Sequence, residues 1–105
     1  MELQAESPSE CGSFEELSIL YTSDSLNVSQ VNHLNRVIYQ TSSKNIPLTN
    51  NQSFFDCAEI TENLVLVDNE GIWGTYALDR DGVDVLLTEL DVLIIQKAYG
   101  KGVSR

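Results

Sequence analysis

The chain has 105 residues, which is enough for one domain with a modest core and too few for two domains. Hydrophobic residues make up 42% of the chain, which argues against a wholly disordered protein. Sixteen acidic residues against six basic ones give a formal net charge of −10. Phosphate-mediated nucleic-acid binding and docking on an anionic membrane both need a basic surface, so this charge argues against both functions. A basic protein partner fits the charge instead.

The cysteine pattern predicts a protein without disulfides. Cys11 and Cys57 are too few for a disulfide framework and belong to no CxxC pair. With His33 as the single histidine, a structural zinc site is not expected. The first ten residues, MELQAESPSE, lack the basic start and apolar run of a signal peptide, and no stretch has the length of a transmembrane helix. We therefore expect reduced thiols and a cytoplasmic location.

The N-terminal part of the chain is polar and gives mixed signals. Residues 1–13 are expected to form a flexible tail. The run from Ser13 to Glu16 has the spacing of a capping box and favours a short helical turn. Leu17, Ile19 and Tyr21 instead alternate with polar neighbours, as in a half-buried strand. Both interpretations stay open, with a slight preference for the turn.

A first clear helix is predicted from residue 28 to about residue 41. Apolar residues recur there at helical spacing, at Val28, Val31, Leu34, Val37 and Ile38. Asn27 and Gln30 have the spacing of an N-terminal capping box. The helix is expected to end before Pro47, and the polar stretch 45–53 is expected to be a loop.

The second half of the chain predicts a hairpin and a long helix. Residues 63–78 hold two apolar, β-branched runs around a turn at residues 68–71. Residues 83–99 then repeat apolar side chains at steps of three and four. Two strands, 83–87 and 92–98, remain an alternative there because the segment is rich in β-branched residues.

These elements predict an α+β domain over residues 14–100, followed by a frayed tail at 101–105. A small antiparallel sheet would pack against two or three helices.

No pattern in the sequence assigns catalysis, a cofactor or a metal. In the run 79–84 (DRDGVD), aligning Gly82 with the glycine of a calcium loop puts Ala77 and Thr88 at two ligand positions. No local signature supports Cys57 and His33 as a nucleophile and base. The glycines form no phosphate-binding loop. We therefore predict a protein that is not an enzyme and has no cofactor.

Acidic residues are concentrated in one half of the chain. Residues 56–91 hold ten acids and a single base, Arg80. If the fold gathers these acids, they form a face that attracts a basic protein. Strand alternation would place Trp73 and Tyr76 on opposite faces of the hairpin, so that one is an exposed anchor, unless both fill the core, which is the favoured alternative. The predicted partner-binding residues are Asp68, Glu70, Trp73, Tyr76, Asp79, Asp81, Asp84 and Asp91.

The sequence thus predicts a non-enzymatic acidic regulator, such as an inhibitor, immunity protein or adaptor, that binds a basic partner protein. A first alternative is a nucleic-acid mimic of phage type that blocks a host nuclease or a restriction or CRISPR complex. A second alternative is a small subunit of a larger assembly. Val85, Val92, Ile95 and Tyr99 lie outside the main apolar face of the C-terminal helix, and a homodimer or hetero-complex would cover them.

Overall fold

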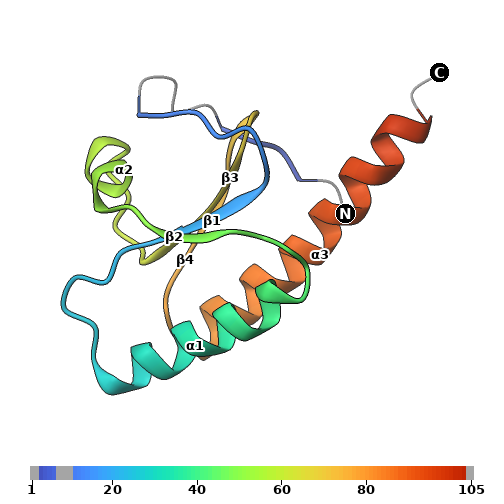
Figure 1. Ribbon diagram of the computed structural model, residues 1–105. Helices are drawn as coiled ribbons and strands as arrows, with labels where there is room; N and C mark the ends of the chain where they lie inside the picture. The colour runs from blue at the N-terminus through green and yellow to red at the C-terminus, as the bar shows by residue number, and fades with distance from the viewer. Residues whose placement is uncertain (1–2, 7–10, 104–105) are drawn as a thin grey trace.

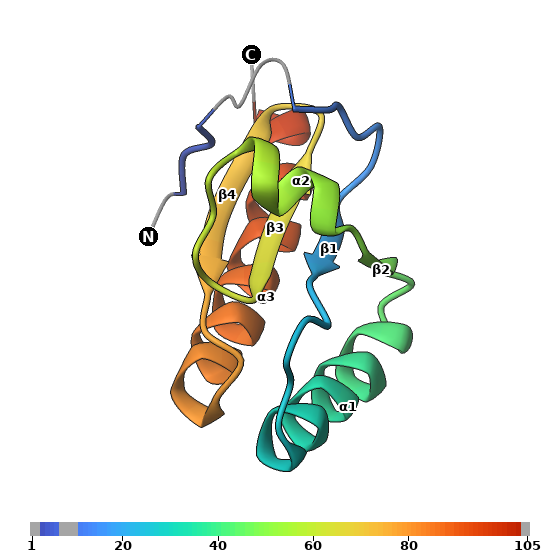
Figure 2. The ribbon, with the colours of Figure 1, turned by 90° about the vertical axis from the view of Figure 1, so that its left-hand side faces the viewer.

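The protein folds as one four-stranded mixed sheet with three helices, which confirms the predicted α+β class (Figures 1 and 2). The fold is described from a computed structural model, for the backbone of residues 3–6 and 11–103 and for their side chains up to residue 99. In chain order the elements are β1 (Ser18–Tyr21), α1 (Val28–Ser42), β2 (Leu48–Asn50), α2 (Gln52–Cys57), β3 (Leu64–Asp68), β4 (Gly71–Tyr76) and α3 (Arg80–Val103).

The sheet has the strand order β2-β1-β3-β4. β1 pairs in parallel with β2 and antiparallel with β3, and β3 and β4 form the predicted hairpin. β3 is therefore a central strand, and all five of its residues are buried. Leu64 and Leu66 face one side of the sheet, and Val65 and Val67 face the other. This two-sided burial explains why β3 is a continuous apolar run rather than an alternating one.

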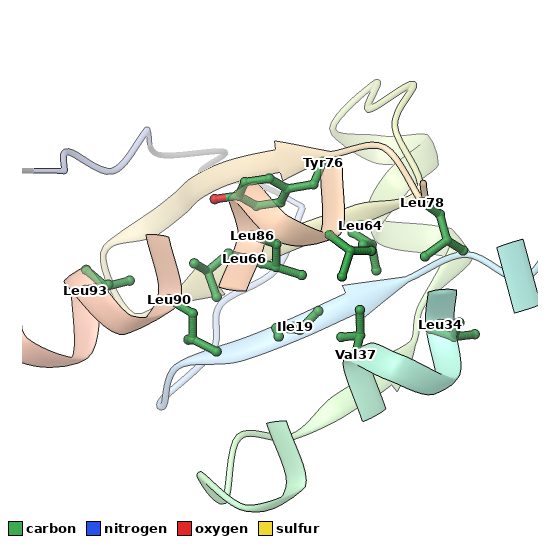
Figure 3. Close-up of a cluster of buried hydrophobic side chains, with 11 residues drawn as sticks. Ile19, Leu34, Val37, Leu64, Leu66, Tyr76, Leu78, Leu86, Leu90 and Leu93 are labelled. Carbon is green, nitrogen blue, oxygen red and sulfur yellow. The ribbon is translucent and has the colours of Figure 1, made fainter. Parts of the chain in front are cut away.

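The larger core lies between the sheet and the helices α1 and α3 (Figure 3). α3 contributes an apolar stripe at steps of three and four, and α1 contributes the buried side chains of Leu34 and Val37. The stripe of α3 consists of Val83, Leu86, Leu90 and Leu93, none of which is exposed to solvent. Burial of each such side chain stabilises the fold by about 1.5–3 kcal/mol, so this layer supplies much of the driving force for folding.

A smaller core covers the opposite face of the sheet. Phe54 and Phe55 of the short helix α2 pack there against Leu20 and the valines of β3. Asn51 caps α2 through a hydrogen bond from the backbone amide of Phe54. The ring of Phe14 meets Phe54 edge to face, with the centroids 5.4 Å apart. The chain before β1 is therefore part of this second core.

A side chain caps the N-terminus of each long helix. The capping box of Asn27 and Gln30 is present in α1, as predicted. Asp79 accepts a hydrogen bond from the backbone amide of Gly82, so α3 begins at Arg80, three residues before the predicted start. A Cβ atom on Gly82 would lie 2.0 Å from the carbonyl oxygen of Ala77, so this turn requires glycine. α3 is a single helix, and the two-strand alternative is wrong.

Two local predictions are wrong. Residues 13–16 form no helical turn, and the strand that was the second choice is present as β1, although it is buried on both sides rather than half-buried. The expected loop 45–53 contains β2 and the start of α2. β2 has only three residues, two of them exposed, so its sequence carries no apolar pattern. It is held by parallel pairing with β1, which is a contact between distant parts of the chain.

The N-terminal segment is joined to the fold at several points. Leu3 exchanges two backbone hydrogen bonds with the side chain of Gln96, and Glu6 forms a bridge with Ile72 of β4. Cys11 forms a disulfide with Cys57 at the end of α2, with the two Cα atoms 5.5 Å apart. The expectation of two reduced thiols is therefore wrong. Disulfides persist in oxidising environments, so the argument for a cytoplasmic location no longer holds.

In the described part of the chain, no helix has both the length and the apolar character that a membrane crossing requires.

Replacing Cys11 and Cys57 together by serine is expected to lower the free energy of unfolding by about 2–4 kcal/mol, because the disulfide closes a long loop in the unfolded chain. Urea unfolding at neutral pH measures the change. Wild-type protein treated with a reducing agent should unfold at the same midpoint as the double variant. An unchanged midpoint in both samples would contradict a stabilising bond.

Candidate interaction surfaces

Lys97 of α3 is the centre of a charged cluster at the hairpin turn. Its ammonium nitrogen lies 2.6 Å from a carboxylate oxygen of Asp68 and 2.9 Å from one of Glu70. It also lies 5.4 Å from the centroid of the Trp73 ring, within range of a cation–π contact. Asp68 is only 2% exposed and accepts a further hydrogen bond from the backbone amide of Glu70. Two of the predicted partner-binding carboxylates, the buried Asp68 and the exposed Glu70, are thus paired with a base of the same chain.

The charges of this cluster stabilise each other. Burial acts to raise the pKa of Asp68, but hydrogen bonds from Lys97 and from the Glu70 backbone outweigh it, and the pKa lies below its ordinary value. Burial acts to lower the pKa of Lys97, and the hydrogen bonds to the two carboxylates outweigh it in the same way, so this pKa is raised. The pair therefore stays charged over a wide pH range.

Two further predicted acids are paired with bases of α1. Asp84 lies 2.6 Å from the guanidinium of Arg36, and Asp91 lies 3.7 Å from the ammonium of Lys44. Both aspartates are about half exposed, so these are surface ion pairs that contribute little to stability. They do, however, cancel much of the negative charge along the seam between α1 and α3.

The two aromatic residues of β4 lie on the same side of the sheet, contrary to the predicted alternation. The register of β3 and β4 shifts between Leu66 and Val67, and Trp73 is the extra residue of this β-bulge. Tyr76 is buried and its hydroxyl donates a hydrogen bond to Glu89 of α3. Burial, followed by the hydrogen bond to Glu89, raises the pKa of Tyr76 far above its ordinary value. Both rings therefore pack towards α3, and neither is a free anchor.

The predicted partner-binding residues do not form one surface. Asp68 and Tyr76 are buried, and Trp73 is half-buried beneath Lys97. Asp79 and Asp81 are exposed at the start of α3, where Asp79 is also the helix cap. The remaining acids of the set are Glu70, Asp84 and Asp91, and each is paired with a base.

Unpaired acids instead lie on α2 and in the segments 11–17, 22–27 and 58–63. Glu15 and Glu16 follow Phe14, which packs on α2, while Asp56 lies within α2 and Glu59 just after it. With Asp24 and Glu62 these residues are called the α2 acids below. In the described part of the chain none of them forms an ion pair, and all but the half-buried Glu62 are exposed. Residues 1–35 and 45–79 contain neither Lys nor Arg, so no base of these segments can neutralise them.

A polar pocket adjoins the α2 acids, at the ends of the parallel strands β1 and β2. Its lining consists of hydroxyl, amide and carboxylate side chains, from Ser23, Asp24, Ser25, Asn50, Gln52 and Asp56. The amide of Asn50 donates to the hydroxyl of Ser23, and the amide of Gln52 donates to Asp56. A pocket with two carboxylates and no base in its lining favours a cationic group.

The outer face of α3 is a second surface, with several exposed apolar side chains. Val85, Ile95 and Tyr99 are 47%, 57% and 67% exposed, and the half-buried Val92 lies between them. These four residues are called the α3 stripe below. They lie opposite the buried stripe of the same helix, as their sequence positions predicted.

No site for catalysis or metal binding emerges among the residues that the structure describes. No three His, Cys, Asp or Glu side chains come together there as a metal site. Cys57 is bonded to Cys11, so it is not a nucleophile for His33 in this state. Comparisons with protein families, with curated proteins and with solved structures find no match for this chain.

Asp68→Asn is expected to lower the free energy of unfolding by about 1–3 kcal/mol at neutral pH, because it removes a buried charge from Lys97. The matched variant Asp84→Asn breaks an exposed pair and should cost less than about 1 kcal/mol. Urea unfolding of both variants measures the difference.

The difference in the free energy of unfolding between wild type and Asp68→Asn should depend on pH. The pKa of Asp68 is lower in the folded state than its ordinary value of 3.8. The stabilisation that the charged Asp68 contributes is therefore complete above pH 3.8. The gap between wild type and Asp68→Asn should close as the pH falls through the folded pKa. Equal losses in the two aspartate variants, or a gap that persists in acid, would contradict the assignment.

Proposed function

We propose that the protein is a non-enzymatic regulator that binds a basic partner protein through the α2 acids. The observation that carries the proposal is the separation of charge between the two sides of the sheet. The bases in ion pairs, Arg36, Lys44 and Lys97, all lie on α1, after α1 or on α3. These helices cover one side of the sheet and α2 covers the other (Figure 1).

This separation gives the α2 side a net negative field that no ion pair among the described residues cancels. Exposed carboxylates without a counter-ion raise the rate of encounter with a positively charged protein and select against acidic partners. The pocket between Asp24 and Asp56 would receive a Lys or Arg side chain of the partner. The second core and the Cys11–Cys57 disulfide hold this side rigid, which lowers the entropy cost of binding.

The disulfide also indicates the kind of compartment in which the protein would bind its partner. A bond between Cys11 and Cys57 favours an oxidising compartment over the cytoplasm.

Charge-neutral substitutions test the surface directly. The triple variant Asp24→Asn, Asp56→Asn, Glu59→Gln removes three of the α2 acids with little change in shape. The control variant Asp84→Asn, Asp91→Asn removes two acids from the other side. Tagged proteins are used to capture partners from an extract of the native host, at about 0.05 M and about 0.5 M salt, since screening weakens such contacts.

The expected result is a basic protein that wild type and control retain at low salt and that the triple variant loses. Binding measured with the purified partner should weaken at least about tenfold in the triple variant, since each exposed charge contributes a few tenths to one kcal/mol. A partner retained by the triple variant, or no specific partner, would refute the proposal. If nucleic acid competes with this protein for the captured partner, the protein is a nucleic-acid mimic.

A further inference from the structure

Residues 11–16, called the 11–16 segment below, are attached to the fold by few contacts. With the other described residues the segment forms a single hydrogen bond, a local one to Ser18. Cys11 and Phe14 join it to the smaller core, where Cys11 is bonded to the end of α2 and the Phe14 ring packs on Phe54. One half-buried ring does little to offset the entropy of ordering six residues. The position of the 11–16 segment therefore depends on the disulfide.

The disulfide is accessible from the side of Cys57. Cys57 is an exposed residue at the end of α2, whereas Cys11 is half-buried. Exchange of a disulfide begins when a thiolate attacks one of the two sulfurs, and its rate depends on access to that sulfur. Attack by a reductant is therefore favoured at Cys57.

The rest of the fold is held without this bond. The larger core contains neither cysteine, and it lies with α1 and α3 on the side of the sheet away from α2 (Figure 2). Upstream of the 11–16 segment, Leu3 is bonded to Gln96 and Glu6 forms its bridge with Ile72. Loss of the disulfide is therefore expected to free the 11–16 segment between two fixed points, while the sheet and the long helices persist.

We propose that the Cys11–Cys57 bond is a redox switch, and that its reduction by a dithiol releases the 11–16 segment from α2. The oxidised state holds the segment against the smaller core, and the reduced state leaves it tethered only at its two ends.

The reaction is a thiol–disulfide exchange in two steps. A thiolate of the dithiol bonds to Sγ of Cys57 as the bond to Cys11 breaks, and Cys11 leaves as a thiolate that takes up a proton. The second thiol of the reductant then attacks the mixed disulfide and releases Cys57, which is protonated in turn. Two electrons pass from the dithiol to the protein, and the reductant leaves as a disulfide.

The effect of the switch on binding rests on the proposed function. Two of the α2 acids, Glu15 and Glu16, lie in the 11–16 segment, and Asp56 is the neighbour of Cys57 in α2. α2 has only six residues, and a helix of this length is not stable without its contacts to the rest of the fold. In the reduced state a partner must order these acids as it binds, so its affinity is expected to fall.

Cleavage of the purified chain by a glutamate-specific protease tests the release. Oxidised protein and protein reduced with dithiothreitol are cleaved under native conditions, and mass spectrometry gives the rate at each glutamate. Glu70 is the internal control, because it lies in an exposed turn on which the disulfide makes no contact. The ratio of the rate after Glu15 or Glu16 to the rate after Glu70 should rise at least about tenfold on reduction, since proteolysis follows local opening.

A bond that stabilises the whole fold alike would speed cleavage at all these sites together. A ratio that stays within about twofold on reduction would therefore overturn the proposal. The double variant Cys11→Ser, Cys57→Ser should show the ratio of the reduced protein both with and without dithiothreitol. A double variant that keeps the ratio of the oxidised protein would also overturn it.

Binding of the partner is a separate measurement. The basic protein captured by the α2 acids should bind the reduced chain at least about threefold more weakly than the oxidised chain, because two charges lose their fixed positions. An unchanged affinity would refute control of the partner site. The absence of any basic partner would refute the proposed function, whereas the protease rates decide by themselves whether the disulfide is a switch.

Discussion

The whole architecture follows from the need to cover β3 on both faces. Its residues Leu64–Val67 are apolar on each side of the sheet, and none can be left in water without losing the free energy that folds the chain. The long helices α1 and α3 cover one face. The chain has only a short helix for the other face, so α2 is supplemented by Phe14 and by the Cys11–Cys57 disulfide. A small protein with limited apolar material commonly adds a covalent bond at such a point.

The same arrangement separates the charges. The strand that carries the core ends in Asp68, a buried acid, and burial is tolerated because Lys97 reaches it from α3. Arg36 and Lys44 are likewise used on the side of the long helices. The three bases that form ion pairs among the described residues are thus all engaged on one side of the sheet. The α2 acids are left without an ion-pair partner among the described residues as a consequence of how the core is built.

The sequence predicted the elements whose signals are local. Asn27 and Gln30 marked the start of α1, and the apolar stripe of α3 marked its buried face. β2 and the disulfide depend on contacts between distant residues, so no local pattern revealed them. The predicted partner-binding residues do not form one surface, because neighbours in the sequence need not be neighbours in space. One signal was present: Lys97 follows Leu93 by four residues on the buried face of α3, and a lysine at such a position requires an acidic partner.

The α3 stripe and the α2 acids lie on opposite sides of the sheet, and one surface is apolar whereas the other is acidic. The α3 stripe is apolar and would gain free energy by burial against another apolar surface, whereas the α2 acids attract positive charge and repel negative charge.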